Sequence, residues 1–193
     1  MIAMDALPAC HYYSVQAPDK RFDIAIVYVL NHEGKLTEDK SDPGGITNYG
    51  ISIRFLKDED LDIDRTGIIA SQDVKDLSLT CAKSLYKEFF WDKYHYNQIN
   101  DLGIAKKIFD ISVNMGPAQA HKLTKRALNY CRHYKVPIDG TLNAVTIDII
   151  NGLDPLQLLD AIRRQENIFY VNLVHDNQKL DKFLKGWLNR AAE

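Results

Sequence analysis

The chain has 193 residues and a formal net charge of −2, and 46% of its residues are hydrophobic while 26% are charged. These values are typical of a folded globular protein and exclude a disordered chain, a collagen-like repeat and a small disulfide-stapled scaffold. No stretch approaches the roughly 20 apolar residues that a transmembrane helix needs. The near-neutral charge gives no reason to expect nucleic-acid binding, which usually requires a strong basic excess.

The overall charge hides a difference between the two halves of the chain. Residues 1–100 contain 11 Lys and Arg against 16 Asp and Glu, whereas residues 101–193 contain 13 against 10. The first half is therefore acidic and the second half basic. Since a basic surface attracts anionic polymers, we expect the two halves to perform different tasks.

The cysteines and the N-terminal segment bear on the compartment in which the protein is made. Cys10, Cys81 and Cys131 are widely spaced and form no C-x-x-C pair, so neither a zinc site nor a disulfide framework is readable, and free thiols are favoured. Residues 1–20 lack the basic and apolar regions of a Sec signal peptide. We expect synthesis in a reducing compartment and, for an external substrate, another export route.

Apolar periodicity predicts a first helix over residues 22–33, with Asp19 as its N-cap and Gly34 as its C-terminal stop. Residues 1–21 are expected to be an extension with little pattern. The turn-rich segment 42–50, Asp-Pro-Gly-Gly-Ile-Thr-Asn-Tyr-Gly, leads into a short strand over residues 51–56. Residues 58–64 form an acidic loop that lacks the glycine and the final glutamate of an EF-hand, which favours a solvated loop.

Helices are predicted for most of the remaining chain. Their expected ranges are residues 78 or 80 to 90, 102–113, a helix that begins at Pro117, residues 141–150, a long helix that begins at Pro155 behind Asp154, and 179–190. The expected class is therefore mainly α, with one small β feature after the first helix and an all-α C-terminal half.

Glu33 is the most informative residue of the first helix. It lies near the middle of the apolar arc and at the C-terminal end of the helix, where the helix dipole is negative. Burial and the dipole both favour the protonated acid, and a protonated carboxylic acid is what general-acid catalysis requires. The alternative is that the helix frays here and Glu33 simply points to water.

Asp42 and Thr47 follow Glu33 by nine and fourteen residues. Cleavage of a glycosidic bond needs a second group across the bond, which acts as a base on water or as a nucleophile. A turn that folds back past a helix end can present such a group. The alternative for Asp42 is a turn-forming role before Pro43, a common use of aspartate.

Five segments, in this order, together resemble one family: VLNHEG (29–34), DPGGITNYGIS (42–52), LYKEFFW (85–91), FDISVNMGPAQA (109–120) and FLKGWLNR (183–190). The family is the glycoside hydrolase family 108 of phage-like N-acetylmuramidases, which are also described as secretion activator proteins. The resemblance implies a lysozyme-like α+β fold, with a catalytic region over residues 22–107 and a helical peptidoglycan-binding region over residues 108–193. We expect the two regions to pack as one globular unit.

The resemblance also implies roles for single residues. The catalytic acid of the family is the Glu of an E-G-G motif, which reads Glu33-Gly34-Lys35 here. The spacing of Glu33, Asp42 and Thr47 resembles the Glu-Asp-Thr arrangement of phage lysozymes, in which Asp and Thr hold an attacking water and the configuration inverts. By this resemblance Asp42 and Thr47 position water.

Sugar contacts are expected at two places. Asn48 and Tyr49, beside the catalytic turn, are candidate sugar contacts, because a tyrosine offers a ring face and a hydroxyl. Past the end of the helix that closes near residue 90, the aromatic side chains Trp91, Tyr94 and Tyr96 are candidates to line a saccharide groove. Core packing is favoured for the ring of Trp187, which falls on an apolar stripe.

Other classes of enzyme find less support. His32-Glu33 begins like a zinc-protease motif, but the second histidine position is Leu36. No nucleophile elbow, Walker A motif or dinucleotide fingerprint is present. We expect no metal and no cofactor, because an acid and a positioned water suffice for the chemistry.

The sequence thus predicts a peptidoglycan hydrolase that cleaves the β-1,4 bond between N-acetylmuramic acid (MurNAc) and N-acetylglucosamine (GlcNAc). Its expected partner is the glycan strand, with no nucleic acid and no membrane insertion. We expect it to be made in the bacterial or phage-infected cytoplasm and to act on the wall after release by a holin-type or dedicated route. The alternatives are a non-catalytic peptidoglycan-binding or secretion-accessory protein, which Lys35 favours, and a lytic transglycosylase.

Overall fold

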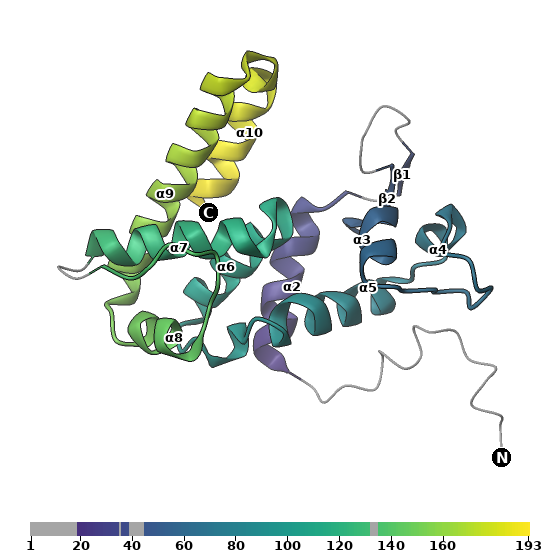
Figure 1. Ribbon diagram of the computed structural model, residues 1–193, viewed down its shortest axis with the longest axis horizontal. Coiled ribbons are helices and arrows are strands. Elements are labelled where there is room, and N and C mark those ends of the chain that lie inside the picture. Colours follow the sequence, from purple (N-terminus) through teal and green to yellow (C-terminus); the bar gives the residue numbers. More distant parts are fainter. Residues whose placement is uncertain (1–18, 35, 39–44, 132–134) are drawn as a thin grey trace. The chain divides into compact units, whose positions relative to one another are not determined.

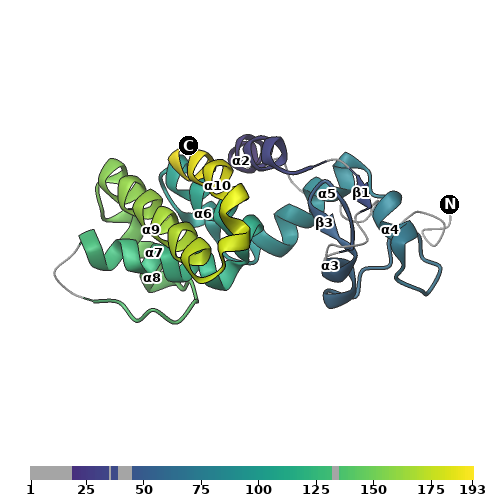
Figure 2. The same cartoon turned by 90° about the horizontal axis from the view of Figure 1, so that it is seen from above.

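The computed structural model describes residues 19–34, 36–38, 45–131 and 135–193. The chain forms two compact units, Met1–Lys93 and Tyr94–Glu193, and Figures 1 and 2 show their elements coloured along the sequence. Helices dominate the described residues, and the only β structure among them is one small sheet after the first helix. The predicted fold class is confirmed, whereas the predicted boundary between the functional regions stays a prediction.

Helix α2, Lys20–His32, opens the described part of the first unit. The carboxylate of Asp19 caps it by accepting the backbone N–H groups of Arg21 and Phe22, as the sequence predicted. The buried face of α2 consists of Phe22, Ala25, Ile26 and Val29. The helix ends at Glu33, whose extended backbone (φ −87°, ψ 138°) makes it the C-cap.

A three-stranded antiparallel sheet follows α2. It consists of β1 (Thr37–Glu38), β2 (Ile46–Asn48) and β3 (Ile51–Ser52), in that order. Asn48 pairs with Ile51, so the hairpin loop has two residues. Both have positive φ (52° for Tyr49 and 78° for Gly50), which is the requirement of a type I′ turn.

The strand predicted over residues 51–56 ends at Ser52, and helix α3, Ile53–Asp58, begins there. The hydroxyl of Ser52 accepts the backbone N–H of Phe55 at 3.1 Å and so caps α3. The β-branched and aromatic residues of this segment favour a strand, but a serine N-cap is a strong helix start, and here the cap prevails.

The first unit continues with α4 (Ser71–Lys75), α5 (Leu79–Tyr86) and the π-helical segment η2 (Lys87–Asp92). Trp91 in η2 is buried, and its indole N–H donates to the Asp19 carboxylate at 2.9 Å. This hydrogen bond connects the N-cap of α2 to η2, the segment that directly follows α5.

The expectation of free thiols was wrong for Cys81. Cys81 in α5 is buried and disulfide-bonded, whereas Cys131 is a free thiol. Because disulfide pairing depends on which cysteines meet in space, wide spacing along the chain gave no indication of it.

The second unit is helical throughout its described residues. It comprises η3 (Tyr96–Gln98), α6 (Leu102–Met115), α7 (Pro117–Cys131), α8 (Ala144–Asn151), α9 (Pro155–Asp176), η4 (Gln178–Leu180) and α10 (Asp181–Ala192). Helix α7 packs against α6 and α9, and α10 packs along α9 (Figure 1). The predicted helices are all present, with ends that differ by a few residues. Among the described residues, no helix combines the length and apolar character needed to span a membrane.

Buried ion pairs join three helices of the second unit. The Lys107 ammonium lies 2.9 Å from Glu166 Oε2 and donates to the Arg190 carbonyl at 2.9 Å. The Arg190 guanidinium forms a bidentate ion pair with the Asp110 carboxylate, with hydrogen bonds of 2.7 and 3.1 Å. Since Lys107, Asp110 and Glu166 are almost completely buried, this network fixes α10 against α6 and α9.

A second buried polar group centres on His121 of α7. Its Nδ1 lies 3.0 Å from the Gly140 carbonyl and therefore carries the proton, while Nε2 lies 2.9 Å from the Tyr96 hydroxyl and accepts from it. Burial lowers the pKa of His121, and the nearby Lys125 lowers it further. The histidine is therefore held neutral in the folded protein.

This neutral histidine makes stability depend on pH. The unfolded chain takes up a proton near pH 6.5 that the folded chain binds only at lower pH, so the free energy of unfolding decreases as pH falls below about 6.5. We expect His121→Gln to remove this part of the decrease, measured as the difference between urea unfolding at pH 7.5 and 5.5. An unchanged pH dependence in the variant would contradict the assignment.

Candidate active site

Glu33 lies against the β2–β3 hairpin turn. Its side chain is half-buried, and a Cβ placed on Gly50 would stand 2.6 Å from Glu33 Oε2 and 2.9 Å from Cγ. Real Cβ atoms do not approach other heavy atoms so closely. Because Gly50 has no side chain, the Glu33 carboxyl group can occupy this position.

Tyr86 of α5 forms the third side of this arrangement. Its side chain is 1% exposed, and its hydroxyl donates to the Tyr49 carbonyl at 2.9 Å. The same Cβ on Gly50 would lie 2.5 Å from the Tyr86 hydroxyl oxygen. The end of α2, the hairpin turn and the end of α5 thus meet at one point, which we call the Glu33 cradle (Glu33, Tyr49, Gly50 and Tyr86).

The cradle holds the Glu33 side chain in a defined position. Its backbone is fixed at the C-cap of α2, and its side chain is confined by the turn, yet part of its surface remains exposed. A carboxyl group held in this way can transfer a proton to a group that approaches from solvent, because geometry is the first requirement of acid catalysis. The frayed end that the sequence left open is not observed.

Gly50 allows a test of the cradle by substitution. We expect Gly50→Ala to destabilise the protein by about 1–3 kcal/mol, because alanine disfavours positive φ. We also expect it to displace the Glu33 carboxyl group, because the new methyl group overlaps it. Urea unfolding measures the first effect, and an activity assay on a glycan substrate tests the second.

Gly67→Ala is the matched control for this substitution. Gly67 has a similar φ of 83°, but a Cβ there meets no atom within 4 Å. We expect its backbone strain to lower stability while activity is retained. Equal activity of the two variants would show that the contact between Gly50 and Glu33 is unimportant.

The remaining residues of the hairpin differ in their surroundings. Thr47 in β2 is half-buried, and its Cα is paired with those of Thr37 and Ser52. Tyr49 is also half-buried, at the tip of the turn. Asn48 is 8% exposed, and its amide donates to the carbonyl groups of Val74 and Leu77 at 3.1 and 3.3 Å.

Asn48 therefore anchors the hairpin to α4 and to the segment that follows it. Both protons of its side-chain amide are used in these bonds, so direct donation to a sugar is not supported by this geometry.

The three aromatic candidates beyond α5 lie in different units, Trp91 in the first and Tyr94 and Tyr96 in the second. Trp91 belongs to the first unit and is 0% exposed. A ring without exposed surface cannot stack on a sugar, so the structure does not support Trp91 as a saccharide contact. The same holds for Tyr96, which is also 0% exposed. Tyr94 belongs to the second unit, where its ring packs edge-on against His121 and lies 6.0 Å from that of Tyr96.

Two residues important to the sequence argument, Asp42 and Lys35, lie outside the described residues. Conversely, sequence reasoning missed Gly50 and Tyr86 as parts of the site. For Gly50 a local signal exists, because an Asn-Tyr-Gly sequence between two short strands favours a turn with positive φ at the glycine. No local signal indicates that a tyrosine 37 residues further along the chain than Tyr49 reaches this turn.

One acidic group among the described residues could hold a metal ion. The carboxylate oxygens of Asp62, Asp64 and Asp73 lie within 4.8 Å of one another. These oxygens accept backbone N–H groups from the same loop, at Ile63, Thr66, Gly67 and Ala70 among others. Side-chain and backbone hydrogen bonds from Thr66 lower the pKa of Asp64. The carboxylates thus have a structural role in shaping the loop.

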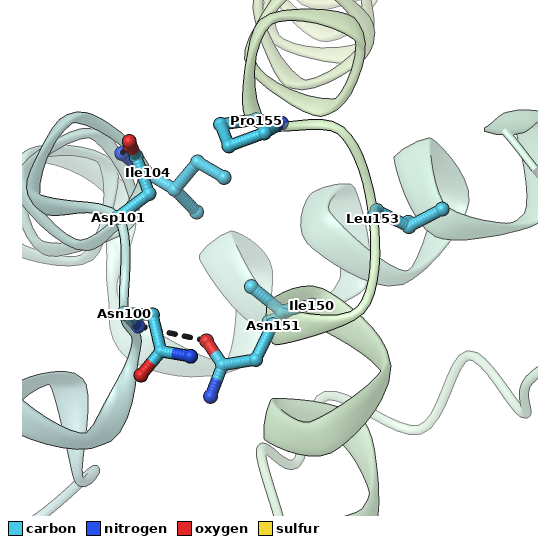
Figure 3. Close-up of a pocket in the computed structure, with 7 residues that line it drawn as sticks. All are labelled: Asn100, Asp101, Ile104, Ile150, Asn151, Leu153 and Pro155. Carbon is cyan, nitrogen blue, oxygen red and sulfur yellow. Dashed lines mark hydrogen bonds between the residues drawn. The ribbon is translucent and has the colours of Figure 1, made fainter.

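The second unit contains a small hollow between the start of α6, the end of α8 and the start of α9 (Figure 3). Its volume is about 40 Å³, which accommodates a few water molecules but no sugar ring. Asn151 closes one side by accepting the backbone N–H of Asn100 at 2.7 Å. The hollow is therefore a packing feature, and the Glu33 cradle remains the candidate active site.

Comparison with known proteins gives two family matches and one similar fold. Residues 26–116 match the family model Glycosyl hydrolase 108, and residues 119–192 match the model Predicted Peptidoglycan domain. The fold is similar to that in a solved structure of SagA from Brucella abortus, with a TM-score of 0.71, 23% sequence identity and 89% of each chain covered. A comparison with curated protein sequences found no match.

Proposed function

This chain belongs to the glycosyl hydrolase 108 family and carries a predicted peptidoglycan domain at its C-terminal end, and on that premise we propose that it is an N-acetylmuramidase. Its substrate is the glycan strand of peptidoglycan, and the bond cleaved is the β-1,4 bond between MurNAc and GlcNAc. The observation that carries the proposal is the Glu33 cradle, in which the half-buried side chain of Glu33 is held between the hairpin turn and Tyr86.

In the proposed reaction, Glu33 donates its proton to the glycosidic oxygen as the bond to the anomeric carbon breaks. A water molecule attacks that carbon and loses a proton to a base, so that one water is consumed for each bond cleaved. Asp42 and Thr47 are the proposed positioning groups for this water. Tyr49 is the proposed sugar contact of the hairpin, and Asn48 contributes indirectly by anchoring the hairpin.

Tyr86 and Gly50 act as positioning residues in this mechanism. Tyr86 fixes the carbonyl group of Tyr49 and therefore the turn, while Gly50 leaves space for the carboxyl group of Glu33. Correct placement of an acid within a few tenths of an ångström matters, because a displacement of about 1 Å can cost 100-fold in rate.

The second unit is the proposed peptidoglycan-holding part. It contains the 13 basic and 10 acidic residues of the C-terminal half, since residues 94–100 contain none. A net positive charge suits a polymer that carries carboxylates. We propose action in the cell wall after release from the cytoplasm, and the disulfide at Cys81 supports a final location in an oxidising compartment.

The products formed from purified sacculi test the proposal. Mass spectrometry is expected to find fragments that end in a reducing MurNAc and contain the elements of water. Anhydro-MurNAc ends would instead indicate a lytic transglycosylase, and reducing GlcNAc ends would indicate a different bond. Intact sacculi that merely sediment with the protein would favour the non-catalytic alternative, to which Lys35 points.

A further inference from the structure

An aromatic stack runs from the core of the second unit to its surface. The ring of Trp187 in α10 is stacked on that of Tyr170 in α9, with centroids 5.1 Å apart and planes at 19°. Phe183 continues the stack, 5.7 Å from Trp187 with planes at 28°. Tyr170 is 2% exposed, whereas Phe183 is 47% exposed. Helices α9 and α10 lie side by side (Figure 1). The stack between them thus ends in an aromatic ring that is supported on one face by Trp187 and exposed at the surface.

Gly186 lies one helical turn after Phe183, in the interior of α10. Glycine destabilises a helix interior relative to alanine, so its presence calls for a reason. The helical backbone gives none, and a Cβ at this position would meet no atom within 4 Å. The fold of the described residues therefore has no steric need for this glycine.

The missing side chain does have an effect on the surface. Side chains on a helix lean toward its N-terminus and cover the preceding turn. A side chain at position 186 would therefore lean over Lys182 and Phe183, which precede it by four and three residues. Gly186 keeps the surface beside the Phe183 ring open, and it allows a ligand to approach the helix backbone closely.

The charge around this surface is positive. Lys179 and Lys182 are exposed, and neither has an acidic partner within the described ranges. The ammonium of Lys182 lies 4.8 Å from the centroid of the Phe183 ring. Such a cation–π contact is weak at an exposed site, so a ligand can displace the flexible side chain and leave its charge at the edge of the ring.

We propose that the Phe183–Gly186 surface of α10, defined by Lys179, Lys182, Phe183 and Gly186, binds the glycan strand of peptidoglycan. A sugar ring stacks on Phe183 and lies over the backbone at Gly186, while the two lysines face carboxylates of the stem peptides attached to the strand. An aromatic face suits the apolar face of a sugar, and the lysines distinguish an anionic glycan from a neutral one. This inference rests on the proposed function and names the surface by which the second unit holds the wall.

Gly186→Ala gives the sharpest test, because the same substitution should raise the stability of the protein and lower its affinity for the glycan strand. We expect the denaturant midpoint of the full-length protein to rise, since alanine favours the helix, while the affinity for purified sacculi falls. Binding is measured by co-sedimentation in a Glu33→Gln background, so that the polymer stays intact. Phe183→Ala is expected to weaken binding about tenfold, which corresponds to the loss of one good stacking contact.

Leu156→Ala is the control, since Leu156 is an exposed apolar residue (79%) in α9 of the same unit. Its affinity is expected to equal that of the parent. If Gly186→Ala and Phe183→Ala also bind as tightly as the parent, the surface is not the binding site, although the proposed function stands. If the parent itself does not sediment with sacculi, both the surface and the peptidoglycan-holding role are overturned.

Discussion

Replacing Glu33 with Gln is expected to lower the rate of glycan cleavage by about 10²–10⁴-fold, the range attributed to a positioned general acid. Glutamine retains the size and shape of the side chain, so it fits beside Gly50 and Tyr86 as the carboxyl group does. It has no acidic proton to donate to the leaving oxygen. The measurement is the rate at which reducing ends appear from purified sacculi, at equal concentrations of folded protein.

Glu59→Gln is the matched control for this prediction. Glu59 lies in the same unit and forms a surface ion pair with Lys93 at 3.0 Å. Because exposed pairs of this kind contribute little to stability, we expect a fold and a cleavage rate close to those of the parent. If Glu33→Gln also cleaves at the parental rate, Glu33 is not the acid.

The largest expected effect on stability comes from Lys107→Met in the second unit. Removing one partner of a buried ion pair typically destabilises a protein by about 3–5 kcal/mol, because the other charge stays buried without compensation. Here the charge left without its partner is that of Glu166, which is 0% exposed. The carbonyl group of Arg190 also loses its donor. Urea unfolding measures the change in free energy.

The pH dependence of this variant provides an internal check. Burial raises the pKa of Glu166, and Lys107 opposes that rise. Without Lys107 the folded protein holds a proton that the unfolded chain releases, so the destabilisation grows as pH rises above about 4.5, the ordinary carboxyl range. A loss of stability that is independent of pH would contradict this explanation.

Two further variants separate charge from packing. In Lys107→Met/Glu166→Leu the stranded carboxylate is gone, and we expect most of the stability to return, because apolar side chains often replace a buried pair without loss. Lys185→Met, at an exposed position of α10, is expected to change stability by less than about 0.5 kcal/mol. If the double variant is as unstable as the single one, packing rather than charge is responsible.

The elements that the sequence predicted well are those governed by local rules. The N-cap at Asp19 and the end of α2 at Glu33 follow from capping chemistry and apolar periodicity. The predicted strand beyond Ser52 failed because strand-forming residues followed a serine in the N-cap position, and the two local preferences competed.

The position of Trp91 could not be predicted in the same way. Apolar periodicity placed the end of the helix near residue 90 and left Trp91 beyond it, but the chain continues as the π-helical segment η2 to Asp92. Its wider turn changes which side chains face inward. The bond from Trp91 to Asp19 then joins residues 72 positions apart, a relation that no local pattern contains.

The candidate site shows the same division. Glu33 was recognisable because a carboxyl group on an apolar arc at a helix end conflicts with ordinary placement. Its neighbours in the cradle come from a hairpin and from α5, and they meet Glu33 only through the tertiary fold. Periodicity and the family resemblance together therefore pointed to Glu33 as the candidate acid, while the groups that confine its side chain required the structure.

Chemical analysis of the ends that the unmodified protein releases from purified sacculi decides whether the chain is an N-acetylmuramidase. We expect new reducing ends to accumulate with time and MurNAc to carry them. Protein that sediments with the sacculi while no new reducing ends form would contradict it and would leave the Glu33 cradle without a catalytic role.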